Sequence, residues 1–318
     1  MKPISLRLIT AFLCIVAFGA CTSKKAVKNQ EGPKVQATSL FGDELYAPTR
    51  SEEQQGRLLQ NLAEAQKQYD HDPNELNTIW LGRRHAYLTD YNQAIETFTN
   101  GLKQFPDSYR LYRHRGHRYV STRQFDKAIA DFKAAYELMP KDTTEIEPDG
   151  IPNKLNTPLS NTQFNILYHY GLAHYLKGEF AQAETIYREC LDYSGNSDLW
   201  VATSDWLYMT LRRQNKTAEA DAVLATIADD LEIIENDSYF KRLMMYKGKL
   251  AIEELFKTNE ADAALSLATQ GYGMANWYLY NGDTTKAREI YTDILKGSSW
   301  SPFGYIAAEA DLLHIGKE

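Results

Sequence analysis

The sequence predicts an all-α solenoid, in which pairs of antiparallel helices stack along most of the chain. The first observation is a repeat of 34 residues. It relates Gly82 to Gly116, Tyr91 to Phe125, Ala94 to Ala128, Phe98 to Phe132, and Pro106 to Pro140. The second observation is composition: 318 residues include 18 Gly and 10 Pro, which favours long regular elements over many turns. The length is sufficient for a sizeable buried core.

The repeat resembles the tetratricopeptide repeat (TPR), which has two antiparallel helices in every 34 residues. The second copy keeps most of that signature, namely Tyr112, Gly116, Tyr119, Ala128, Phe132 and Pro140. Small residues let two helices approach closely, aromatic residues fill the space between repeats, and proline ends the second helix. The resemblance implies a right-handed superhelix whose groove is lined by the first helix of each repeat. It implies no particular activity, because the fold is a general platform.

The expected elements follow from this period. A TPR solenoid is expected over residues 40–318, with capping helices at 52–70 and 302–315 that shield the ends of the stack. Repeats are expected near residues 75–108, 109–142, 164–197, 201–235, 238–267 and 268–301, of which the fifth is degenerate. In the third copy, Cys190 takes a position that needs a small residue, which indicates a buried core thiol.

The first residues are typical of a targeting signal. Two basic residues precede an apolar stretch at 8–20, which is shorter than the roughly 20 residues that span a bilayer. The sequence Phe18-Gly19-Ala20-Cys21 resembles a bacterial lipobox, which implies a signal peptide at 1–20 and lipidation of Cys21. Residues 21–39 are predicted to form a flexible tether. Thr22 resembles the residue that follows the cysteine in lipoproteins directed to the outer membrane, so we expect an envelope protein facing the periplasm. An incidental cysteine at position 21 is the alternative.

A segment at 141–162 interrupts the period. It contains three prolines and no helical pattern, and loops of this length inside a domain are usually functional or disordered. Apolar residues spread along it favour packing on the solenoid, which would let Glu147 and Asp149 face the groove. Disorder is the alternative, and rapid proteolysis at Lys154 would support it.

Signatures of catalysis and cofactor binding are absent from the sequence. It contains no phosphate-binding loop, Rossmann glycine pattern, GxSxG, HExxH or CxxC. His114 and His117 can share a helix face, but a metal site would need a third ligand. We therefore predict no catalytic residue, no metal and no cofactor. The net charge of −7 argues against broad nucleic-acid binding.

The groove is the predicted binding site. Four arginines fall within residues 109–120 of this acidic chain, and some of them take groove positions. The groove positions of the TPR family fall here on Arg83, Tyr87, Arg110, Arg113, His117, Asn165, Tyr168 and Tyr175. The same register turns Arg115 and Arg118 away. Because arginine binds carboxylates through paired hydrogen bonds, the groove would suit an acidic or C-terminal segment of a partner. Solvated arginines, or arginines paired with Glu147 and Asp149, are the alternative.

Two functions fit these observations. The first is a lipid-anchored, non-enzymatic adaptor of the bacterial envelope that binds a protein or peptide segment in its groove. The second is an enzyme or small-molecule sensor whose pocket is closed by the 141–162 loop. The edges of TPR domains often permit self-association, so the sequence is compatible with both a homo-oligomer and a monomer.

Overall fold

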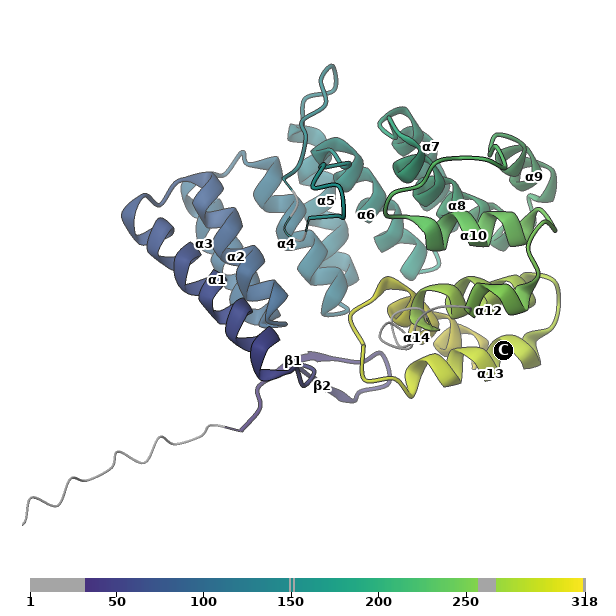
Figure 1. Cartoon of the computed structure of the whole chain (residues 1–318), viewed down its shortest axis with the longest axis horizontal. Helices are drawn as coiled ribbons and strands as arrows, with labels where there is room; N and C mark the ends of the chain where they lie inside the picture. Colours follow the sequence, from purple (N-terminus) through teal and green to yellow (C-terminus); the bar gives the residue numbers. More distant parts are fainter. Residues whose placement is uncertain (1–31, 149, 151, 257–266, 317–318) are drawn as a thin grey trace, which may run out of the picture. The chain divides into compact units, whose positions relative to one another are not determined.

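Antiparallel helix pairs account for most of the chain, as the 34-residue period predicts (Figure 1). The computed structural model describes residues 32–148, 150, 152–256 and 267–316. Residues Pro33–Glu318 form one unit by their contacts. The predicted signal peptide at 1–20, Cys21, Asp149 and part of the degenerate fifth repeat lie outside the described residues.

The helix α1 (Glu52–His71) packs on the first of four successive pairs. These pairs are α2 (Glu75–Tyr87) with α3 (Tyr91–Gln104), α4 (Tyr109–Ser121) with α5 (Phe125–Leu138), α6 (Thr162–Leu176) with α7 (Phe180–Asp192), and α8 (Ser197–Arg213) with α9 (Thr217–Ala225). They are followed by α10 (Asp237–Tyr246), the 3₁₀ helix η1 (Ile252–Phe256), the π-helical turn η3 (Leu267–Gly271), α12 (Tyr272–Tyr280), α13 (Thr284–Leu295) and α14 (Phe303–Ile315).

Local sequence explains where these helices begin and turn. The first helix of each of the four pairs follows an Asn or Ser whose side chain accepts a backbone N–H of the first turn, namely Asn74, Ser108, Asn161 and Asn196. The turn inside each pair contains one residue with left-handed backbone: Thr89, Arg123, Gly178 and Asn215, with φ of 63°, 62°, 77° and 60°. The pairs therefore share one turn geometry, whichever residue the sequence supplies.

The predicted contact between small and aromatic residues is present in the core. A Cβ added to Gly82 would lie 2.2 Å from the ring of Phe98, and both residues are buried. The same relation holds between Gly116 and Phe132 and between Gly171 and Tyr187. Cys190 is fully buried, as expected for a core thiol, and burial raises its pKa to about 12.

The chain before α1 differs from the expected tether. Residues Val35–Thr38 form strand β1, which pairs antiparallel with β2 (Glu44–Tyr46), although the tether was predicted to extend to residue 39. Asn92 of α3 donates to the carbonyl oxygen of Val35 at 3.0 Å. Gln36 and Ala37 are both buried, so the middle of this short strand packs against the repeats.

The C-terminal end of the stack returns to the N-terminal repeats. Arg123, in the turn between α4 and α5, forms an ion pair with Glu309 of α14 and donates to the carbonyl oxygen of Trp300. The indole Nε1 of Trp300 donates to the carbonyl oxygen of Tyr46 at 2.6 Å, and its ring meets Tyr91 edge-on. These contacts hold the start of the segment 300–304 against β2, α3 and the turn between α4 and α5.

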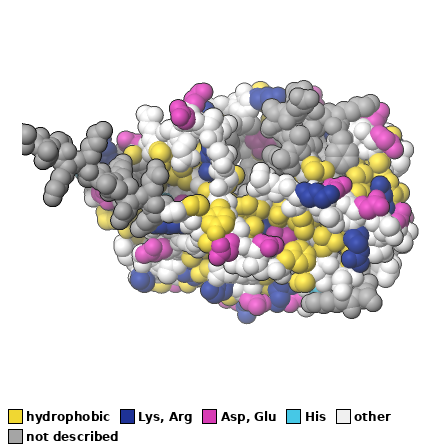
Figure 2. Space-filling model, turned by 90° about the horizontal axis from the view of Figure 1, so that it is seen from below, with side chains coloured by type: hydrophobic (Ala, Val, Ile, Leu, Met, Phe, Trp, Pro, Cys, Tyr) yellow, Lys and Arg dark blue, Asp and Glu magenta, His cyan; other side chains and the backbone are white. Residues whose placement is uncertain are grey.

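The outer surface is mixed in charge. Figure 2 shows one face, on which acidic, basic and hydrophobic side chains are interspersed rather than gathered into one basic field. Such a face does not offer the positive surface that phosphate backbones require. Among the described helices, each is too short or too polar to cross a bilayer.

Candidate functional site

The four arginines of α4 have different environments. Arg115 donates to both carboxylate oxygens of Asp131 at 2.8 Å, which ties α4 to α5, as its predicted position away from the groove requires. Arg110 and Arg113 contact the 141–162 loop. Arg118 lies over the ring of Tyr91 at 5.0 Å and has no carboxylate partner among the described residues.

The base of the inserted loop is held on α4 by acidic side chains. Residues 145–147 run antiparallel to residues 160–162, with Glu147 N–H donating to Ser160 O at 3.0 Å. Two carboxylates of this extended segment then reach α4, because alternate residues of a strand point the same way. Glu145 accepts from Arg110 and from the Tyr109 hydroxyl, both at 2.6 Å. Glu147 lies 3.0 Å from Arg113 in a buried ion pair.

Arg110 and Arg113 both form ion pairs with carboxylates of the protein itself. Glu145 of the loop pairs with Arg110, and the expected Glu147 pairs with Arg113. Glu75 of α2 also lies 3.3 Å from Arg110, and Asp149 lies outside the described residues. Arg83 joins the same segment by donating to Pro148 O at 2.9 Å and to the Tyr87 hydroxyl at 3.2 Å. The loop tip is different: Lys154 is exposed and Leu155 is 63% exposed.

Three cavities adjoin along the concave side of α2 and α4. The first, the loop cavity, has a volume of about 490 Å³ and is lined by Leu76, Ile79, Trp80, Arg83, Arg110, His114, Thr162 and residues 145–148. The second, the histidine cavity, has about 140 Å³ and is lined by Arg83, Ala86, Tyr87, Phe98, Arg113, His114, His117, Arg118 and Glu147. The third, the Arg118 cavity, has about 310 Å³ and shares His117 and Arg118 with the second.

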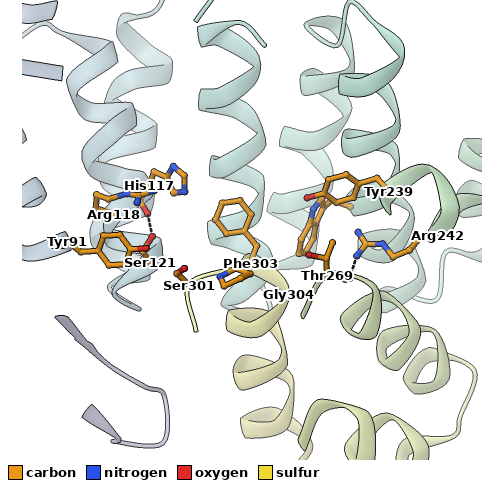
Figure 3. A pocket seen from close by; sticks show the side chains of 12 residues that line it. Tyr91, His117, Arg118, Ser121, Tyr239, Arg242, Thr269, Ser301, Phe303 and Gly304 are labelled. Atoms are coloured by element: carbon orange, nitrogen blue, oxygen red, sulfur yellow. Dashed lines mark hydrogen bonds between the residues drawn. The ribbon is translucent and has the colours of Figure 1, made fainter. Parts of the chain in front are cut away.

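The Arg118 cavity is built from segments far apart in the sequence (Figure 3). Tyr91, His117, Arg118 and Ser121 come from α3 and α4, and Tyr239, Arg242 and Thr269 come from the opposite side. Phe303 lies between the two groups. Phe303, Gly304, Ser301, Pro302 and Trp206 complete the lining.

Three histidines between these cavities are held neutral. Burial lowers the pKa of His114, His117 and His169 well below 6.5, and the neighbouring Arg113 and Arg118 guanidinium groups lower it further. The rings of His117 and His169 lie 4.4 Å apart, and Phe303 packs against both. His169 Nδ1 lies 2.6 Å from Asn165 O, so this nitrogen carries the hydrogen. A neutral pair of this kind stabilises packing rather than carrying charge.

The predicted groove residues of the third repeat lie elsewhere. Tyr168 donates to the Tyr239 hydroxyl at 2.9 Å, and Asn165 donates to Ser160 Oγ at 3.1 Å. The Tyr175 hydroxyl accepts from Tyr272 and Asn276. All three predicted residues are buried and line none of the three cavities. The inserted loop packs against Asn165, and later helices pack against Tyr168 and Tyr175.

Arg118 lines two cavities, although its position in the repeat predicts that it points away from the groove. Residues 301–304 also line the Arg118 cavity, which the repeat pattern does not predict. The groove positions of the repeat apply to an open superhelix, in which Arg118 would point away from the groove. The returning C-terminal segment gives the cavity a second wall, so the residue next to His117 lines it as well. Local sequence carries no signal for that return. Within the described residues, no three His, Cys, Asp or Glu side chains come together as metal ligands.

These features define a helical-repeat protein with a partly filled concave face, and family comparisons agree. Models of the tetratricopeptide repeat match residues 81–143 and 164–197. The chain therefore contains tetratricopeptide repeats over these residues.

The fold is also similar to that of solved TPR proteins. One is YrrB, described as a TPR protein with an unusual peptide-binding site, at 13% identity and a TM-score of 0.40, covering 80% of this chain and 98% of that one. Another is a TPR protein from Parabacteroides merdae ATCC 43184, at 12% identity and a TM-score of 0.45, covering 81% and 93%. A search of curated protein sequences gives no match.

Proposed function

We propose that this protein is a non-enzymatic adaptor of the bacterial envelope, anchored through lipid on Cys21 and facing the periplasm from the outer membrane. It binds an extended segment of a protein partner at the loop cavity. TPR proteins are generally non-enzymatic scaffolds, which supports the class of function. The lipobox-like residues 18–21 support the anchor.

The observation that carries the binding proposal is the apolar surface around the loop cavity. Leu76 is 55% exposed and Ile146 is 71% exposed, and Trp80 lines the cavity between them. Arg83 and Arg110 stand at the same cavity. An apolar centre with tryptophan and arginine beside it is the composition typical of interaction hot spots.

The chemistry of the partner follows from the loop. Arg83, Arg110 and Arg113 already hold residues 145–148 through two carboxylates and one carbonyl oxygen. Arg83 itself has no carboxylate partner among the described residues. A partner segment with an apolar residue for the cavity and an acidic residue beside it would therefore match both the exposed apolar side chains and Arg83.

Catalysis is less well supported by the same geometry. The carboxylate of Glu147 is fixed by Arg113, and His117 is packed between His169 and Phe303. A general base needs a titratable group within reach of a substrate proton, and these groups are committed to the protein itself.

The test is cross-linking and affinity capture from membranes with matched variants. Leu76→Glu and Arg83→Glu should each lose the captured partner. The controls Leu59→Glu and Arg57→Glu place the same changes on exposed positions of α1, where Leu59 is 48% exposed, and should retain it. Equal capture by all four variants would reject binding at this cavity. Cys21→Ser should abolish fatty-acid labelling, and persistent labelling would reject the anchor.

A further inference from the structure

Arg118 differs from the other arginines inside the protein. Carboxylate partners neutralise Arg113, Arg115, Arg123, Arg213 and Arg242. The guanidinium of Arg118 has the Tyr91 ring as its neighbour, and no ion pair to it exists in the described residues. Burial lowers its pKa, and Arg83 contributes to the decrease. A half-buried cation without a counter-charge is costly, and a bound anion would remove that cost.

Among the described residues, no carboxylate compensates the positive charge of Arg118 at its cavity. Its described lining contains no Asp or Glu, and its second arginine, Arg242, is paired with the buried Asp205. The hydroxyl groups of Ser121 and Ser301 lie on the same lining. A single guanidinium matches a singly charged carboxylate, which it binds through two parallel hydrogen bonds. A phosphate dianion would need further donors or a second free cation.

Three aromatic side chains, Trp206, Tyr239 and Phe303, also line the cavity. Phe303 lies between the side of Arg118 and the side of Tyr239 (Figure 3). Trp206 and Tyr239 are held by neighbouring tyrosines. At about 310 Å³, the cavity is at the lower end of the range of small-molecule sites. That volume accommodates an acid with one ring.

We infer that the Arg118 cavity binds a small monocarboxylic acid with an apolar or aromatic body. The carboxylate binds Arg118, and the body lies among Trp206, Tyr239 and Phe303. This site lies apart from the apolar surface of the loop cavity and does not require a protein partner. The two proposals can therefore fail separately.

The wall that closes the cavity is held by contacts outside it. Trp300 is fixed by Arg123 and by Tyr46, and residues 301–304 follow it directly. The added Cβ of an alanine at Gly304 would lie 1.9 Å from Ala268 O, so the backbone of this wall packs closely on η3. A preformed wall favours binding of a rigid ligand, since little order is lost when it binds.

The test is titration calorimetry on the full-length protein with matched probes. N-acetylphenylalanine should bind, while its uncharged amide and inorganic phosphate should bind at least about tenfold more weakly, because the charged pair is lost or mismatched. Arg118→Gln should weaken binding of the acid by a similar factor, and Arg57→Gln on α1 should leave it unchanged. Thermal unfolding of Arg118→Gln shows whether the fold is intact.

A second experiment distinguishes a small free acid from the C-terminus of a peptide as the source of the carboxylate. A hexapeptide ending in phenylalanine with a free carboxylate is compared with N-acetylphenylalanine. Weaker binding of the peptide supports the small acid, and tighter binding would replace it with a chain terminus. Equal binding of acid and amide, tighter binding of phosphate, or undiminished binding to Arg118→Gln in a folded variant would overturn the inference. Leu76→Glu should leave binding of the acid intact even if it abolishes partner capture.

Discussion

Arg123 and Glu309, which are 186 residues apart in the sequence, form a bidentate ion pair. Arg123 Nε and Nη2 each lie 2.9 Å from one carboxylate oxygen, and the side chains are 3% and 1% exposed. Arg123 has a φ of 62° at a turn position where the third pair has Gly178. Left-handed backbone costs a residue with a side chain about 1–2 kcal/mol. The ion pair therefore sits at a position where local preference alone would favour glycine.

Arg123→Gly should destabilise the protein even though it relieves the backbone. Glu309 would be left buried without a partner, and breaking a buried pair costs about 3–5 kcal/mol. Urea unfolding followed by circular dichroism should show a net loss of about 1–4 kcal/mol once the relief of the left-handed backbone is subtracted. Asn215→Gly, with φ of 60° in an equivalent turn, is the control and should change the free energy of unfolding by less than about 1 kcal/mol. A variant as stable as the parent would contradict a role in closing the stack.

Gly304→Ala should be destabilising because the new methyl group meets backbone. The nearest atom, Ala268 O, would lie 1.9 Å away. Overpacking of this kind costs about 1–3 kcal/mol. Gly56→Ala on α1 has no atom within 4 Å of the new Cβ and should be neutral or stabilising, since alanine favours helix. Thermal unfolding of both variants measures the difference, and equal midpoints would refute the close approach.

Glu147→Ala and Glu145→Ala should have unequal effects. The Arg113–Glu147 side chains are 8% and 10% exposed, whereas those of Arg110 and Glu145 are 40% and 32% exposed. Removal of Glu147 leaves Arg113 buried without its ion-pair partner and should cost about 3–5 kcal/mol. Removal of Glu145 should cost about 1 kcal/mol or less. Equal losses in urea unfolding would show that the loop is not held mainly by Glu147. Cleavage at Lys154 does not separate these cases, because the tip is exposed.

Stability should fall as the pH drops below about 6.5. His114, His117 and His169 have lowered pKa values in the folded protein, so the unfolded chain takes up protons first. Each such histidine lowers the free energy of unfolding by about 1.4 kcal/mol per pH unit between its unfolded and folded pKa. The contributions of paired carboxylates such as Glu179 are lost at lower pH, because their pKa values lie below 4.5.

Unfolding measured between pH 5 and 7 tests this dependence. His117→Gln should reduce the slope of the free energy of unfolding against pH by about one third, since one of the three histidines that take up a proton on unfolding is removed. His71→Gln, at the exposed end of α1, should leave it unchanged. A flat profile in the parent protein would contradict neutral histidines in the core.

Cys190 should be unreactive until the protein unfolds. Its thiol is buried, with a pKa raised to about 12, so little thiolate forms at neutral pH. In a chain with Cys14→Ser and Cys21→Ser, iodoacetamide should label Cys190 only in denaturant. Labelling at the same rate without denaturant would mean that α7 opens locally.

The 34-residue period predicted the repeated architecture because the residues that define it contact each other within one helix pair. Gly82 and Phe98 belong to one helix pair, so their spacing encodes their contact. The groove could be predicted only in part. Glu147 was foreseen near the arginines, but the pairing of Glu145 with Arg110 depends on where the loop turns back. Arg118 could not be placed, because its cavity is completed by residues almost 200 positions away that follow no period.

The return of α14 to the turn at Arg123 has a consequence for how this chain can vary. Open solenoids can gain or lose whole repeats, since each unit contacts its neighbours alone. Here, duplication or deletion of a helix pair between α5 and α14 would carry Glu309 away from Arg123 and Trp300 away from Tyr46. The number of helix pairs between α5 and α14 is therefore constrained by the closure of the stack.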